Sequence, residues 1–217
     1  MLSTRDLSLL PDVDSLRRLM QSLAVLDAVL CREWEFRYYS FNAAWAVGEQ
    51  MGSMRNNSGD EFVAHFGPAG CWVKGFAHEY PMAPYREFPP QIWPGVMDNV
   101  PAEFAACLRE PAFSVENVTF CLWRRHADHG WQIGPITFPP GHRDPDGSEF
   151  LLSILDGRPE SYRAWAADYY TREVDLAAVE HVYRHRPLTP DVITRLNPEV
   201  SPSELAADIG EIGYPAR

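Results

Sequence analysis

Residues 60–79 read DEFVAHFGPAGCWVKGFAHE, and this stretch decides the fold class. Two runs rich in aromatic and β-branched residues flank the turn sequence GPAG, which is the pattern of an antiparallel hairpin. With four loop residues, the first pair below the turn joins Phe66 to Cys71. The next pair joins His65 to Trp72, so the sequence predicts both the hairpin and its register.

The register sorts the hairpin side chains onto two faces, because successive residues of a strand point to opposite sides. One face is apolar and is expected to be core: Phe62, Ala64, Phe66, Cys71, Val73 and Ala77. The other face mixes aromatic, acidic, basic and histidine side chains: Glu61, Val63, His65, Trp72, Lys74, Phe76 and His78. We expect this mixed face to be half-buried, with a diagonal ion pair between Glu61 and Lys74.

The segments around the hairpin add further strands and one helix. Apolar residues recur at three- and four-residue spacing over 14–32, which predicts an N-terminal helix. Alternating residues over 34–38 and 45–51 predict two adjacent strands with Asn42 in their turn. A second hairpin is expected around the turn at 127–130. The central sheet is therefore predicted to contain about six strands.

Two proline-rich segments, 80–95 and 138–150, are expected to cross the surface as ordered loops. Helical spacing then dominates the last third of the chain, with helices opening at Arg158-Pro159 and after Thr189-Pro190. The prediction is an α+β fold: a mostly antiparallel sheet of about six strands built from hairpins, an N-terminal helix and a helical C-terminal third. We expect a single domain over 1–217, and a helical C-terminal subdomain over 148–217 is the alternative.

The chain is acidic, with 19 Lys and Arg against 30 Asp and Glu, a net charge of −11. Residues 145–217 hold 7 basic and 13 acidic residues, so −6 of this charge is C-terminal. A chain of this sign repels phosphate backbones, and nucleic-acid binding is not expected.

The apolar stretches fall short of the roughly 20 residues that span a bilayer, so no membrane association is expected either. The N-terminus lacks the pattern of a signal peptide, which predicts a cytoplasmic protein. Arginine is in strong excess over lysine, which favours a bacterium with a GC-rich genome, because arginine codons are GC-rich.

Sequence motifs for common cofactor and catalytic chemistry are absent, including GxGxxG, GxxxxGK[ST], HExxH and GxSxG. The four cysteines are widely scattered and are expected to be reduced thiols: Cys31, Cys71, Cys107 and Cys121. Two histidine pairs have spacings that could suit zinc, but neither has an evident third ligand: His126 with His129, and His181 with His185. No cofactor and no metal site is therefore expected.

Candidate site residues remain on the strands and in the first proline-rich loop. The candidates for acid–base catalysis are Glu49, Glu61 and His65. Glu49 stands out because an acid on an otherwise apolar strand face must be paired, protonated or at a cleft. The candidates for binding a partner are the mixed-face residues and two loop aromatics: Trp72, Lys74, Phe76, His78, Tyr85 and Trp93. The alternative for the loop aromatics is that they clamp the loop onto the sheet.

Two functions from different classes follow. The preferred one is a non-catalytic acidic binding protein, of immunity or regulatory type, that engages a basic protein partner, as an immunity protein neutralises a basic nuclease toxin. The alternative is a small-molecule enzyme that uses His65 with Glu61 or Glu49 on the mixed face of the hairpin. A deep pocket lined by these groups favours the enzyme, and a flat acidic surface favours the binding protein.

Overall fold

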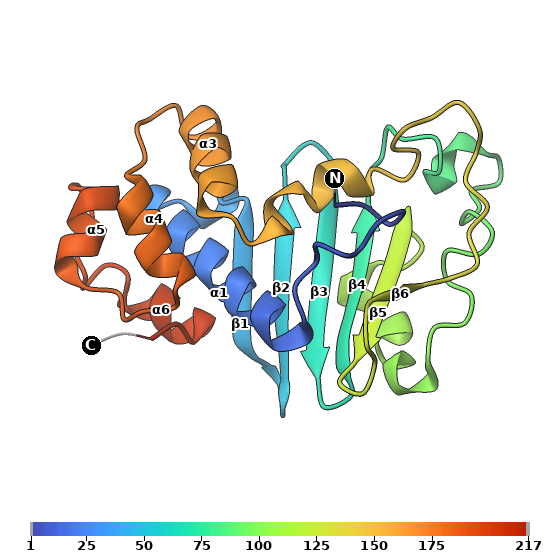
Figure 1. Cartoon of the computed structure of the whole chain (residues 1–217), viewed down its shortest axis with the longest axis horizontal. Helices are drawn as coiled ribbons and strands as arrows, with labels where there is room; N and C mark the ends of the chain where they lie inside the picture. Colours follow the sequence, from blue (N-terminus) through green and yellow to red (C-terminus); the bar gives the residue numbers. More distant parts are fainter. Residues whose placement is uncertain (1, 216–217) are drawn as a thin grey trace.

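A computed structural model describes residues 2–215 and contains one six-stranded antiparallel sheet (Figure 1). Each strand pairs with the next one along the chain, so the sheet order is β1-β2-β3-β4-β5-β6. The strands are β1 Tyr39–Ala46, β2 Glu49–Arg55, β3 Glu61–Gly67, β4 Gly70–Phe76, β5 Phe120–Arg125 and β6 Gln132–Ile133. The predicted α+β fold is confirmed.

The N-terminal helix α1 (Val13–Leu30) packs across one face of the sheet, and the C-terminal helices lie beside it, next to β1 (Figure 1). Its first turn is capped by the Asp12 carboxylate, which accepts a hydrogen bond from the backbone N–H of Ser15. The other helices are α2 Ser148–Leu151, α3 Pro159–Tyr169, α4 Leu176–Tyr183, α5 Pro190–Leu196 and α6 Ala206–Ile212. One apolar cluster contains side chains from α1, from the sheet and from the C-terminal helices.

The central hairpin has the predicted register. Phe66 pairs with Cys71 and His65 pairs with Trp72. All six side chains of the predicted core face are buried against α1 and its neighbours. At the turn, Gly70 has φ +145°, and a Cβ there would lie 2.1 Å from the carbonyl oxygen of Arg124. Glycine is therefore required where β4 approaches β5.

The first hairpin lies further along the chain than its alternation pattern predicts. Residues Trp34–Phe36 form a short 3₁₀ helix, η1, and the predicted strand at 34–38 is wrong. Asn42 lies within β1 opposite Met51, and the turn instead falls at Gly48, whose φ of +76° suits a tight reversal. The physical reason is tertiary, because β1 begins only where the buried Asp27 accepts hydrogen bonds from the backbone at its start.

The mixed face of the sheet is more deeply buried than expected. Residues 80–118 fold over its β3–β5 half and insert a second apolar cluster between themselves and the strands. Trp72 and Lys74 have 0% exposure, so the expectation of a half-buried face is wrong at these positions. The covering segment contains four 3₁₀ turns: η2 Pro84–Arg86, η3 Ala102–Phe104, η4 Cys107–Arg109 and η5 Pro111–Phe113. Its apolar side chains exclude water from the strands beneath it.

Candidate functional site

The structure places the candidate residues in three separate clusters and not in one site. Glu49 and His65 meet at the end of the sheet where β2 begins and β3 ends. Glu61 contacts Lys74 further along β3. His78 contacts Asp60 beyond the ends of β3 and β4.

The first cluster is a line of three titratable side chains. The Nε2 atom of His65 lies 3.0 Å from Oε2 of Glu49, and its Nδ1 atom lies 3.3 Å from Sγ of Cys107. A thiol, an imidazole and a carboxylate in this order are the arrangement that activates a nucleophile in cysteine hydrolases. Sequence reasoning missed Cys107, because it lies on the covering segment, 42 residues from His65.

The environment of Cys107 works against nucleophilic chemistry. Its residue exposure is 3%, and burial raises the pKa of the thiol to about 12, with the nearby Glu49 carboxylate adding to the shift. A thiol of this pKa stays protonated at neutral pH, and the thiolate is the reactive form. Both ring nitrogens of His65 are also already engaged. The line therefore fastens the covering segment to the strands.

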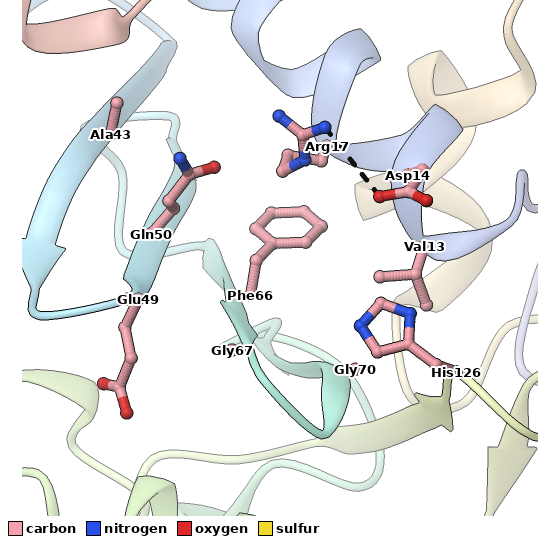
Figure 2. Close-up of a pocket in the computed structure, with 11 residues that line it drawn as sticks. Val13, Asp14, Arg17, Ala43, Glu49, Gln50, Phe66, Gly67, Gly70 and His126 are labelled. Atoms are coloured by element: carbon pink, nitrogen blue, oxygen red, sulfur yellow. Dashed lines mark ion pairs between the residues drawn. The ribbon is translucent and has the colours of Figure 1, made fainter.

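A cavity of about 270 Å³ lies on the opposite side of these strands, against the first turns of α1 (Figure 2). Phe66 and His126 line it from the sheet side, and Arg17, which lies 3.8 Å from Asp14, lines it from α1. Figure 2 shows Glu49 pointing away from Phe66, toward the other face of the sheet. Glu49 is among the residues that line this cavity and His65 is not, so the cavity does not bring the candidate acid and base together.

The second cluster is the predicted diagonal ion pair on the mixed face. The Nζ atom of Lys74 lies 2.8 Å from Oε1 of Glu61. The lysine is completely buried, whereas the glutamate side chain is 33% exposed and faces a groove described below. An ammonium group without water needs such a partner, because an unpaired buried charge is strongly unfavourable.

Replacing Glu61 by glutamine is expected to lower the free energy of unfolding by about 1–3 kcal/mol, because the charge of Lys74 loses its counterion. Chemical denaturation in urea measures this loss. The double variant Glu61→Gln with Lys74→Met is the matched control, since it removes both charges and is expected to recover part of the stability. A Glu61→Gln variant as stable as the parent would contradict the structural role of the pair.

The third cluster ties the end of β4 to the β2–β3 turn. One carboxylate oxygen of Asp60 lies 2.7 Å from Nδ1 of His78 and accepts the backbone N–H of the same residue at 2.9 Å. Its other oxygen accepts a hydrogen bond from the amide of Asn56 at 2.6 Å. These contacts close a turn and leave Asp60 fully engaged.

The remaining binding candidates are divided between the interior and the covering loop. Trp72 and Phe76 are buried with Lys74, so they form an internal packing surface. Tyr85 is exposed and donates its hydroxyl to the side chain of Asn117, and Trp93 donates its indole N–H to the carbonyl of Thr137 at 3.0 Å. Tyr85 thus ties the two ends of the covering segment to each other, and Trp93 ties the segment to the chain at Thr137.

The histidine pairs with zinc-like spacing gain no third ligand in the part of the chain that the structure describes, and His126 and His129 line different pockets. His181 is hydrogen-bonded from Nε2 to the carbonyl of Pro187 at 2.9 Å, and His185 lies beyond the end of α4 with φ +52°. Within residues 2–215, no three His, Cys, Asp or Glu side chains are arranged to hold a metal ion. In that same part of the chain, no helix is long and apolar enough to cross a membrane.

The carboxylate of Asp27 is a buried polar site that sequence reasoning also missed. It accepts hydrogen bonds from the backbone N–H groups of Tyr38 and Tyr39 at 2.9 and 2.7 Å, and from the hydroxyl of Tyr162 at 2.7 Å. Burial raises the pKa of Asp27 to about 6. This carboxylate therefore joins α1, the start of β1 and α3 at one point.

The four thiols are expected to differ sharply in reactivity. Cys31 is partly exposed, whereas Cys71, Cys107 and Cys121 are buried, which raises the pKa of all three well above that of a free thiol. Titration with a disulfide reagent should label Cys31 first in the native protein and all four thiols after denaturation. Rapid native labelling of Cys107 would show that the covering segment opens readily.

Comparison of the chain with protein-family models, with curated proteins and with solved structures found no match. The fold and the clusters together define an acidic α+β protein with a meander sheet. Its strongest polar contacts hold segments of the fold together.

Proposed function

We propose that the chain is a non-catalytic acidic binding protein, of immunity or regulatory type, that engages a basic protein partner in the bacterial cytoplasm. The observation that carries this proposal is the free acidic surface of the C-terminal third. Six exposed acidic side chains there have no ion-pair partner within residues 2–215: Glu160, Asp168, Glu173, Asp191, Glu199 and Glu211. Three exposed arginines of the same region also form no ion pair within residues 2–215, Arg158, Arg163 and Arg186, which leaves an excess of three negative charges. Such an excess attracts a basic partner over distances of about 10 Å at 0.1 M salt.

Other acids of this region are engaged within the fold and are not available to a partner. Asp175 caps α4 and lies 2.8 Å from Arg195, and the hydrogen bond from the Ala178 backbone lowers the pKa of its carboxyl. Glu180 pairs with Arg184 at 2.9 Å. Substitutions that test recognition should avoid these two positions, because they would also weaken the helix.

The test is the salt dependence of association with a basic protein isolated from the host by affinity capture. We expect the association rate to fall steeply as ionic strength rises. The triple variant Glu160→Gln, Asp168→Asn, Glu173→Gln should slow association further. The matched control neutralises three exposed acids elsewhere, Glu87, Asp98 and Glu116, and should have a smaller effect. Equal effects of the two triple variants would contradict a localised acidic surface.

A second candidate function is an enzyme that uses the Glu49–His65 pair, and the 3.0 Å contact between them favours it. A carboxylate that orients an imidazole is a common acid–base unit. Burial raises the pKa of the neighbouring Cys107 thiol, and Glu49 lines the cavity of Figure 2 whereas His65 does not, so the pair as a unit does not open into it and this function has less support. A turnover activity lost in His65→Gln, with the fold intact by circular dichroism, would favour the enzyme.

A further inference from the structure

A groove of about 350 Å³ remains open on the mixed face of the sheet, where the covering segment stops. Its floor is formed by β1, β2 and β3, and includes the hydroxyl pair of Ser40 and Ser53 at 2.7 Å. One wall comes from η5, the last turn of the covering segment, and the other from η1 and α6. The β3–β5 half of this face is packed internally, so only its β1–β3 half is free to receive a partner.

Aromatic side chains line both walls of this groove. On one side, Trp45 of β1 stacks on Phe113 of η5 with ring centroids 5.8 Å apart, and Phe113 stacks in turn on the buried Trp72 at 5.7 Å. On the other wall, Trp34 is 52% exposed. Trp45 is partly exposed and is supported from behind by the second apolar cluster, which is typical of the residues that dominate binding energy at interfaces.

The groove already contains a cation held on an aromatic ring. The guanidinium carbon of Arg55 lies 4.4 Å from the ring centroid of Trp34. Such contacts arise because the face of the indole is electron-rich and attracts a cation. The groove thus has an aromatic ring that binds a guanidinium group, and a second guanidinium group from a partner could form the same cation–π contact.

The charges of the groove and its rim are negative in sum. Glu61 and Glu211 line the groove, and the exposed residues Glu33 and Glu35 flank Trp34. Two cations lie among these four carboxylates, Arg55 in the groove and the buried Lys74, which leaves an excess of −2. Glu33, Glu35 and Glu211 form no ion pair within the described part of the chain.

We propose that this groove is the docking site for the basic protein partner, and that it receives an exposed segment in which arginine stands among apolar residues. The inference rests on the proposed function and narrows it to one surface. Apolar side chains of the segment would cover Trp45 and Phe113, while its guanidinium group lies between Trp34 and the carboxylates of Glu61 and Glu211. Charge complementarity selects arginine, and the aromatic walls favour it over lysine.

The probe for this site is a blocked hexapeptide in which leucine alternates with arginine. We expect it to shift the indole N–H resonances of Trp34 and Trp45 in nuclear magnetic resonance spectra of the labelled protein. The same peptide with citrulline in place of arginine keeps the shape but loses the charge, and it should bind about 10-fold more weakly. This comparison separates charge recognition from simple apolar contact.

Variants on the two sides of the molecule locate the contact. Trp34→Ala should weaken binding of the arginine peptide about 10-fold or more, and Glu211→Gln about 3-fold. Both positions are exposed, so the variants should keep the melting temperature of the parent. Glu87→Gln removes an equal charge outside both the groove and the C-terminal acidic surface, and Phe88→Ala removes a more exposed aromatic ring; neither should change the affinity. Glu173→Gln tests the C-terminal acidic surface separately.

Two results would overturn the proposal that the groove is the docking site, and they differ in what they imply for the proposed function. If Glu173→Gln weakens binding and Trp34→Ala does not, the groove proposal is wrong, but the C-terminal acidic surface still recognises the basic probe. If no arginine peptide binds, the groove proposal is wrong, and the basic-partner function then depends on the salt-dependence experiment with the captured protein. Equal affinity for the arginine and citrulline peptides would also overturn the proposed charge recognition.

Discussion

Replacing Trp72 by alanine is expected to lower the free energy of unfolding by about 3–5 kcal/mol, as large-to-small changes in a packed core do. The indole has 0% exposure and lies between the strands and the covering segment, where it stacks on Phe113. Its loss leaves a cavity that the rigid sheet cannot close. Urea denaturation followed by circular dichroism measures the change.

Two comparisons make this expectation specific. Phe66→Ala, on the opposite face of the same hairpin, should cause a loss of similar size, because both faces of β3 and β4 are covered. Trp34→Ala, at the exposed rim of the groove, should change stability by less than about 1 kcal/mol. A small loss for Trp72→Ala would mean that residues 80–118 do not pack on the sheet in solution.

The second large effect is expected at Asp27. Asp27→Ala removes the acceptor of two backbone N–H groups at the start of β1 and of the Tyr162 hydroxyl, so it should cost about 2–5 kcal/mol. Asp27→Asn should cost much less, because an amide can present its oxygen to the backbone and its NH₂ group to the hydroxyl. Equal losses of unfolding free energy in the two variants would show that the hydrogen bonds to residue 27 do not contribute to stability.

The same residue predicts an unusual pH dependence. Its folded-state pKa of about 6 lies above the ordinary value of 3.8, so the folded chain holds a proton that the unfolded chain releases between these limits. The contribution of Asp27 to the free energy of unfolding therefore rises as pH falls from about 6 to about 4, by up to about 3 kcal/mol. The stability of Asp27→Asn should lack this contribution, and the difference between the two pH profiles measures it. Parallel profiles would contradict the raised pKa.

Local sequence patterns determined several elements directly. Alternation around GPAG at 67–70 specified the hairpin and its register, because a period of two and a short turn leave one way to pair the strands. The diagonal contact between Glu61 and Lys74 followed from that register. Pro159 and Pro190 correctly marked the first turns of α3 and α5, since proline fits the first position of a helix.

Contacts between distant segments were decided only by the tertiary structure. The line from Cys107 through His65 to Glu49, the buried acceptor Asp27 and the open groove all depend on where residues 80–118 and the C-terminal helices come to rest. The backbone path of an irregular segment has no period that a sequence displays. Its course is selected by burial of its apolar side chains and by satisfaction of its polar groups against the rest of the fold.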